Sequence, residues 1–158
     1  MCRISNIECR TSKVNRWHVP CSIDRMRPNA LDNLRVFQLG KQAAVAVSAL
    51  IDETELRKDF NLRDQLRRAS SSVPAQIAEG FGQVSDRHFA SYLYMARGGC
   101  NEVRAHLDLA RSRGLLSVDD HGRICELYEH EGRMLTRLIQ HLEREDRTGK
   151  RGKRTTRR

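Results

Sequence analysis

Apolar residues recur every three or four positions along four stretches of the chain, and each stretch predicts one amphipathic helix. The stretches cover about residues 31–53, 62–80, 85–112 and 117–144. Short connections force consecutive helices to turn back on one another. The pattern therefore predicts an all-α fold, an antiparallel up-down four-helix bundle. The expected core positions include Phe37, Val47, Leu66, Ile77, Phe89, Cys100, Leu107, Ile124 and Leu138.

Several residues are typical of helix ends. Asp32 or Asn33 could cap the first helix, and Ser85 is a candidate N-cap for the third. Ser117 begins a sequence typical of a capping box, and Gly114 is suited to the left-handed position that ends a helix.

Other residues interrupt the helical pattern. Pro74 removes a backbone donor, so we expect the second helix to kink, or to break and restart, beside it. Gly98 and Gly99 each cost about 1 kcal/mol relative to Ala inside a helix. That cost suggests close approach of the backbone to a neighbour, within the bundle or across an oligomer contact. Glu131 and Gly132 break the apolar stripe of the fourth helix.

Length and composition limit the alternatives. The chain has 158 residues, enough for one core, and its 5% aromatic content is low for a sandwich or barrel. We expect a poorly ordered basic leader over 1–30, the bundle over 31–146 and a disordered cationic tail over 147–158. No apolar run is long enough to span a bilayer, and the N-terminus lacks a signal-peptide core, so we expect a cytoplasmic protein without membrane contact.

The net charge of +9 is concentrated at the two ends of the chain. Residues 31–146 contain 16 cationic and 18 acidic residues, whereas residues 147–158 contain seven cations and no acid. Such a segment cannot form a core, and nucleic acid is the anion it would most often meet. The alternative is a tail that only keeps the protein in solution. The seven cations are Arg147, Lys150, Arg151, Lys153, Arg154, Arg157 and Arg158.

A second group of cations lies on the predicted second helix. Arg63 and Arg67 are four residues apart and share a helix face, with Arg68 beside them. They could contact phosphates. The alternative, which we favour, is ion pairing with acids such as Asp64, Glu79 or Glu102, within the bundle or between protomers.

The sequence contains no recognisable catalytic motif. There is no Walker loop, no Glu-x-x-His pair for a di-iron site and no His-Glu-x-x-His zinc motif. Cys100 lies on an apolar stripe and is expected to be a small core residue. The five cysteines are expected to be reduced, and the spacing of those in the leader matches no compact zinc knuckle. We therefore expect no enzymatic activity, no cofactor and no metal.

Three sequence elements resemble a known family. Gln-Leu-Arg-Arg at 65–68, Ile-Ala-Glu-Gly at 77–80 and Ala-Arg-Gly at 96–98 occur in the order and spacing of the four-helix-bundle proteins of ribosomal RNA intervening sequences. The same superfamily includes the accessory variability determinants of diversity-generating retroelements. The resemblance covers about residues 31–142. Gln76 and Gly99 depart from the residues that are usual in the family.

The resemblance implies a ring, typically a homopentamer, which in the retroelement branch binds nucleic acid alongside a reverse transcriptase. Apolar side chains beyond one helix face are the candidate ring interface. They are Phe81, Tyr92, Tyr94 and Met95. We expect a non-enzymatic, RNA- or DNA-binding oligomeric accessory or scaffold protein, with a reverse transcriptase as a candidate partner. The alternative is a homo-oligomeric protein-protein interaction module with no nucleic-acid role.

Overall fold

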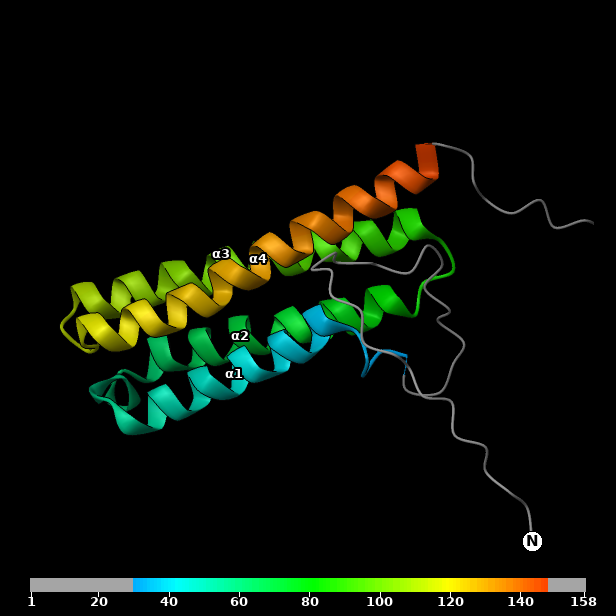
Figure 1. Ribbon diagram of the computed structural model, residues 1–158. Helices are drawn as coiled ribbons and strands as arrows, with labels where there is room; N and C mark the ends of the chain where they lie inside the picture. Colours follow the sequence, from blue (N-terminus) through cyan, green and yellow to red (C-terminus); the bar gives the residue numbers. More distant parts are fainter. Residues whose placement is uncertain (1–29, 148–158) are drawn as a thin grey trace, which may run out of the picture.

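The computed structural model describes residues 30–147, and within them every regular element is a helix (Figure 1). The side chains of residues 146 and 147 are not described. The prediction of an all-helical chain with four long helices is confirmed. In chain order the elements are α1 (Arg35–Glu53), the single-turn 3-10 helix η1 (Glu55–Lys58), α2 (Phe60–Phe81), α3 (Asp86–Ser112) and α4 (Val118–Arg147). The predictions for residues 1–29 and 148–158 lie outside the described segment.

The helices form a bundle in which each packs against two neighbours. α2 lies between α1 and α3, and α4 lies between α3 and α1. Figure 1 shows the four helices lying lengthwise beside one another, with short connections at alternate ends. α3 has 27 residues and α4 has 30, so both are about 40 Å long or slightly longer. None of the helices in the described segment is apolar enough over a sufficient length to cross a membrane.

One contiguous core joins all the helices. The apolar stripe of each helix faces inward, and Leu66, Phe89, Leu107 and Ile124 have no exposed surface. Phe81 is only 6% exposed and packs edge to face against Phe89, with ring centroids 5.9 Å apart. The expectation that Phe81 presents apolar surface to a partner is therefore wrong, because the end of α2 turns its ring into the core.

The helix ends follow the sequence signals in α3 and α4 but not in α1. The Ser85 hydroxyl accepts the His88 amide at 3.2 Å, and the Ser117 hydroxyl accepts the Asp120 amide at 3.0 Å. Gly114 has φ 71°, the predicted left-handed conformation. Neither Asp32 nor Asn33 caps α1, whose N-cap is Leu34 without a side-chain hydrogen bond.

α2 continues through Pro74 without interruption. The predicted break and restart is therefore wrong, while the kink stays a prediction. A proline inside a helix loses one backbone hydrogen bond. Its ring lies where α2 meets α1, since a Cβ built on Gly40 would be 3.5 Å from the Pro74 Cβ.

The two adjacent glycines of α3 differ. A Cβ on Gly99 would lie 3.0 Å from Val73 Cγ2 and 3.3 Å from the Ser72 hydroxyl, so Gly99 permits the close approach of α2 and α3. A Cβ on Gly98 would meet nothing within 4 Å. The predicted close approach within the bundle is thus confirmed for Gly99 alone.

Candidate nucleic-acid interface

The cationic tail begins inside the last helix. Arg147, assigned from sequence to a disordered tail, is the last residue of α4, because the helix extends about three residues beyond its predicted end. The other six tail cations, from Lys150 to Arg158, lie outside the described residues. α4 therefore leads directly into the most basic segment of the chain.

Two of the three arginines predicted on α2 form ion pairs within the protomer. Arg63 Nε is 2.9 Å from Asp64 Oδ1, and the guanidinium lies 4.8 Å from the centre of the Phe60 ring. Arg67 Nη2 is 2.8 Å from Asp52 Oδ1 on α1. These contacts favour the structural interpretation of Arg63 and Arg67.

Arg68 differs from the other two arginines of α2. It is exposed and forms no ion pair with any residue of the segment 30–147. It is thus the one member of the α2 group without a carboxylate at ion-pair distance among the described residues.

The remaining candidate interface residues are partly exposed. Tyr94 and Met95 are 43% and 49% exposed, and both lie on α3. Tyr92 is half-buried, and its hydroxyl donates to Glu79 Oε1 at 2.9 Å. Tyr94 donates to Glu143 Oε1 on α4 at 2.8 Å. Of the four candidate interface residues, therefore, Tyr94 and Met95 are the two that expose substantial apolar surface.

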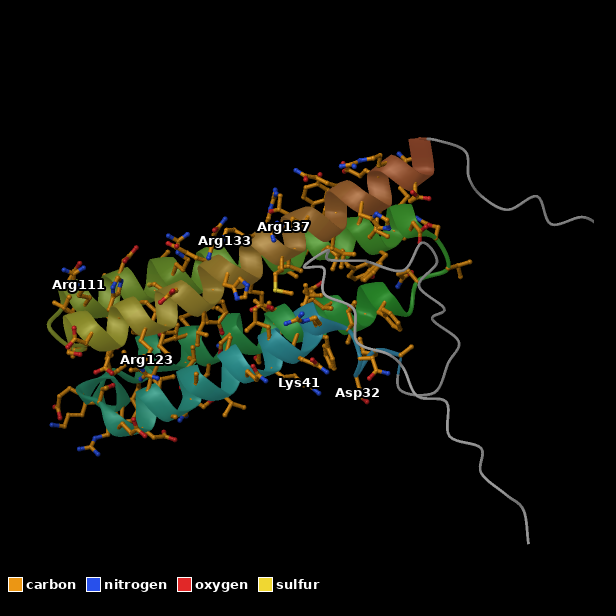
Figure 2. All side chains as sticks on the ribbon, in the orientation of Figure 1. Asp32, Lys41, Arg111, Arg123, Arg133 and Arg137 are labelled. Atoms are coloured by element: carbon orange, nitrogen blue, oxygen red, sulfur yellow. The ribbon has the colours of Figure 1, made fainter. Side chains whose placement is uncertain are left out.

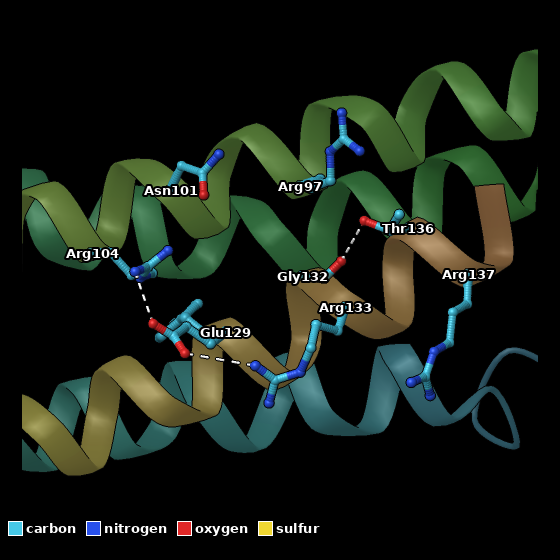
Figure 3. Close-up of a pocket in the computed structure, with 9 residues that line it drawn as sticks. Arg97, Asn101, Arg104, Glu129, Gly132, Arg133, Thr136 and Arg137 are labelled. Atoms are coloured by element: carbon cyan, nitrogen blue, oxygen red, sulfur yellow. Dashed lines mark hydrogen bonds and ion pairs between the residues drawn. The ribbon is translucent and has the colours of Figure 1, made fainter. Parts of the chain in front are cut away.

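A groove that sequence reasoning did not predict runs along the outer seam between α3 and α4, with a volume of about 450 Å³ (Figure 3). Four arginines and a single acid line it, with small and polar residues between them. α3 contributes Arg97, Asn101 and Arg104, and α4 contributes Tyr128, Glu129, Gly132, Arg133, Thr136 and Arg137. We call this feature the arginine groove.

One carboxylate holds two of these arginines in place. Arg104 Nη2 lies 2.9 Å from Glu129 Oε1, across the seam, and Arg133 Nη1 lies 3.6 Å from Glu129 Oε2 on the same helix. Arg97 and Arg137 form no ion pair within the described part of the chain. The arginine groove therefore has an excess of positive charge.

The guanidinium groups lie on both sides of the groove. In Figure 3, Arg97 extends from α3 on one side of the groove, and Arg137 extends from α4 on the other side. Figure 2 shows Arg133 and Arg137 on the outer side of α4. Cations distributed in this way suit a chain of phosphates better than one small anion, because each can meet a different phosphate.

Small side chains give the groove its depth. A Cβ on Gly132 would meet nothing within 4 Å, so this position leaves open space on α4. The Thr136 hydroxyl donates to the Gly132 carbonyl at 2.8 Å and so does not project fully across the groove. The glycine that interrupts the apolar stripe of α4 thus lies on the groove side.

α4 also carries a buried acidic side chain, at a position where the apolar pattern of the helix is interrupted. Glu131 is fully buried, and neither carboxylate oxygen has a hydrogen-bond partner in the described structure. Gly40 on α1 makes room for it, since a Cβ there would be 2.6 Å from Glu131 Oε1. Burial raises the pKa of Glu131 to about 8. Glu131 is therefore mainly protonated at neutral pH.

The cysteine on the core stripe also behaves as predicted. Cys100 is 1% exposed, and burial, with a contribution from Glu131, raises the pKa of its thiol well above the usual range. A thiol that resists ionisation is a poor nucleophile. Its position supports a packing role.

The arginine groove had a weak signal in the sequence. Arg97 and Arg104 are seven residues apart, and Arg133 and Arg137 are four apart, so each pair shares a helix face. Which face of α3 meets which face of α4 depends on the pairing of the two helices. Spacing along one helix does not give that information.

Comparisons with known proteins agree on the fold. The profile of the 23S rRNA-intervening sequence protein family matches residues 32–137. A crystal structure of a protein of unknown function from the S23 ribosomal protein family of Bacteroides thetaiotaomicron superposes with a TM-score of 0.61 at 22% identity. The alignment covers 66% of this chain and 98% of that chain. No curated protein shows significant similarity to the chain.

Proposed function

Because the chain belongs to the family of 23S rRNA-intervening sequence proteins, we propose that it is a non-enzymatic, oligomeric accessory protein that binds RNA or DNA through the backbone phosphates. The arginine groove is the observation that carries this proposal. Four arginines and one glutamate line a groove on the outer surface of α3 and α4. Such a surface attracts a polyanion without reading its sequence.

The direction of α4 supports the same proposal. Arg133 and Arg137 lie in the second half of the helix, which ends at Arg147 and leads into a segment with six more cations. A nucleic-acid strand held in the arginine groove can continue onto that segment. The groove would then position the strand, and the tail would add affinity.

The assembly we propose is a closed ring, most simply a homopentamer, with Tyr94 and Met95 at the contact between protomers. The exposed apolar surface of these two residues supports a contact at this place. A ring would repeat the arginine groove in every protomer and raise the effective concentration of phosphate-binding sites. A reverse transcriptase that copies a template RNA is the partner we propose for such a ring.

Binding of the full chain to labelled single-stranded RNA and DNA, measured by fluorescence anisotropy at several salt concentrations, tests the proposal. The matched comparison is the chain that ends at Arg147, which lacks six tail cations and keeps all of α4. We expect binding that weakens steeply with salt, a lower affinity for the shortened chain, and residual binding that comes from the arginine groove.

Absence of binding by the full chain at low salt would contradict the proposal. That result would favour the alternative, a homo-oligomeric protein-protein interaction module. Equal affinity and equal salt dependence for the two chains would exclude a contribution from the tail while leaving the groove as the binding surface.

A further inference from the structure

A second cluster of polar side chains lies farther along the α3–α4 seam. Asp108 is four residues after Arg104 on α3, and Cys125 is four residues before Glu129 on α4. His121 Nε2 is 2.6 Å from Asp108 Oδ1 and 3.4 Å from Cys125 Sγ. The three potential ligand atoms all lie within 4.8 Å of one another.

One ring nitrogen of His121 faces both the thiol and the carboxylate. In a nucleophilic triad the thiol would contact one nitrogen of the imidazole and the carboxylate would contact the other. The imidazole could then accept the proton of the thiol while the carboxylate orients the ring. Here His121 Nε2 can form only one strong hydrogen bond. The Asp108 carboxylate and the Cys125 thiol therefore cannot both be strongly hydrogen-bonded to it. Convergence of sulfur, nitrogen and oxygen on one point is typical of a metal site.

We propose that Asp108, His121 and Cys125 bind a zinc ion that links the end of α3 to the beginning of α4. Thiolate and imidazole together favour Zn²⁺ over harder cations such as Mg²⁺ or Ca²⁺. On binding, Cys125 releases its proton to solvent and the thiolate coordinates the ion, with no change of oxidation state. A water molecule would complete the fourth position of a tetrahedral site.

The distances fit this assignment. Tetrahedral zinc with ordinary Zn–N and Zn–S bonds separates the nitrogen and sulfur by about 3.6 Å, and the His121–Cys125 separation is 3.4 Å. The nitrogen and carboxylate oxygen would need to move apart by about 0.7 Å. The side chain of Asp108 is 68% exposed and can make that adjustment, whereas that of His121 is 13% exposed and held in place.

Helix geometry explains why these two α4 residues act together. His121 and Cys125 are four residues apart and therefore project from the same face of the first turns of α4. Asp108 reaches them from the last turns of α3.

Metal titration of the untagged full chain tests the proposal, with the leader cysteines Cys2, Cys9 and Cys21 replaced by Ser in every sample. Co²⁺ is the spectroscopic probe, because coordination by a thiolate produces a charge-transfer band, and Zn²⁺ should displace it. We expect one ion per protomer. Cys125→Ser should remove the band and weaken zinc binding at least about 100-fold.

Two further variants make the test decisive. Asp108→Asn changes an exposed residue and should fold normally, keep the thiolate band and lower the zinc affinity at least about tenfold. His130→Gln is the matched control, since His130 is an exposed histidine of the same helix and should have no effect. Absence of a thiolate band in the background chain, or a band that survives Cys125→Ser, would overturn the proposal.

Discussion

The two faces of α4 accommodate charge in opposite ways. On the inner face the carboxyl group of Glu131 is fully buried, has no hydrogen-bond partner in the described structure and is mainly protonated. On the outer face Arg133 and Arg137 are exposed and belong to a groove with four arginines and one acid. The inner face therefore determines stability and the outer face is available for binding. Substitutions on one face should leave the property of the other face unchanged.

The largest expected effect is on binding. Arg133→Glu combined with Arg137→Glu replaces two cations of the arginine groove with acids. Affinity for single-stranded RNA should fall on the order of 1,000-fold at low salt, because two phosphate contacts are replaced by repulsion. Anisotropy gives the affinity, and thermal unfolding should show a nearly unchanged melting temperature. The matched control is Arg63→Gln with Arg67→Gln, two ion-paired arginines of α2, and it should change RNA affinity less than about threefold.

The next largest effect is on stability. Glu131→Met removes a buried carboxyl group without a partner and keeps a flexible side chain of similar length. We expect the free energy of unfolding at pH 8 to rise on the order of 3 kcal/mol, with unchanged RNA affinity. Urea unfolding measures the change. A loss of stability would show that Glu131 has a stabilising partner.

The pH dependence of this effect has a definite sign. The pKa of Glu131 is raised from 4.5 to about 8 in the folded protein, so the unfolded chain loses this proton more easily. The stabilising contribution is complete below pH 4.5 and is lost as the pH rises through about 8. The stability difference between Glu131→Met and the unchanged chain should therefore be small at pH 4.5 and grow toward pH 8. Urea unfolding at a series of pH values measures it, and a constant difference would contradict the assignment.

The smallest effects distinguish two neighbouring glycines of α3. Gly98→Ala should stabilise the protomer by about 1 kcal/mol, because its Cβ meets no neighbour and alanine favours the helix. Gly99→Ala should destabilise it by about 1 kcal/mol or more, because its Cβ would be 3.0 Å from Val73. Light scattering of both variants adds a readout of assembly. Weaker assembly with Gly98→Ala would place that residue in a contact between protomers.

Features encoded within one helix could be predicted from the sequence. The apolar periodicity gave the four helices, and Ser85 and Gly114 have the end conformations that their chemistry favours. Asp32 and Asn33 were reasonable caps by residue type, but α1 begins at Arg35, too late for either to be its N-cap.

Features that depend on the pairing of helices could not be predicted in this way. Glu131 is buried because Gly40, 91 positions earlier, lacks a side chain at the point where α1 faces α4. The arginine groove and the Asp108–His121–Cys125 cluster likewise join residues of α3 and α4. Both features depend on how α3 and α4 are aligned against each other. The spacing of residues along either helix does not determine that alignment. The burial of Phe81 likewise depends on the packing of α2 against Phe89 of α3, which the spacing along α2 does not predict.

The salt dependence of RNA binding tests the central claim, that the arginine groove holds the nucleic-acid backbone, most directly. Each phosphate contact on a single strand contributes about −0.7 to the slope of log affinity against log salt concentration. Arg97→Gln with Arg137→Gln in the full chain removes two arginines that form no ion pair within residues 30–147. The account predicts a slope that is less steep by about 1.4 and an unchanged melting temperature. A slope equal to that of the unchanged chain would contradict it.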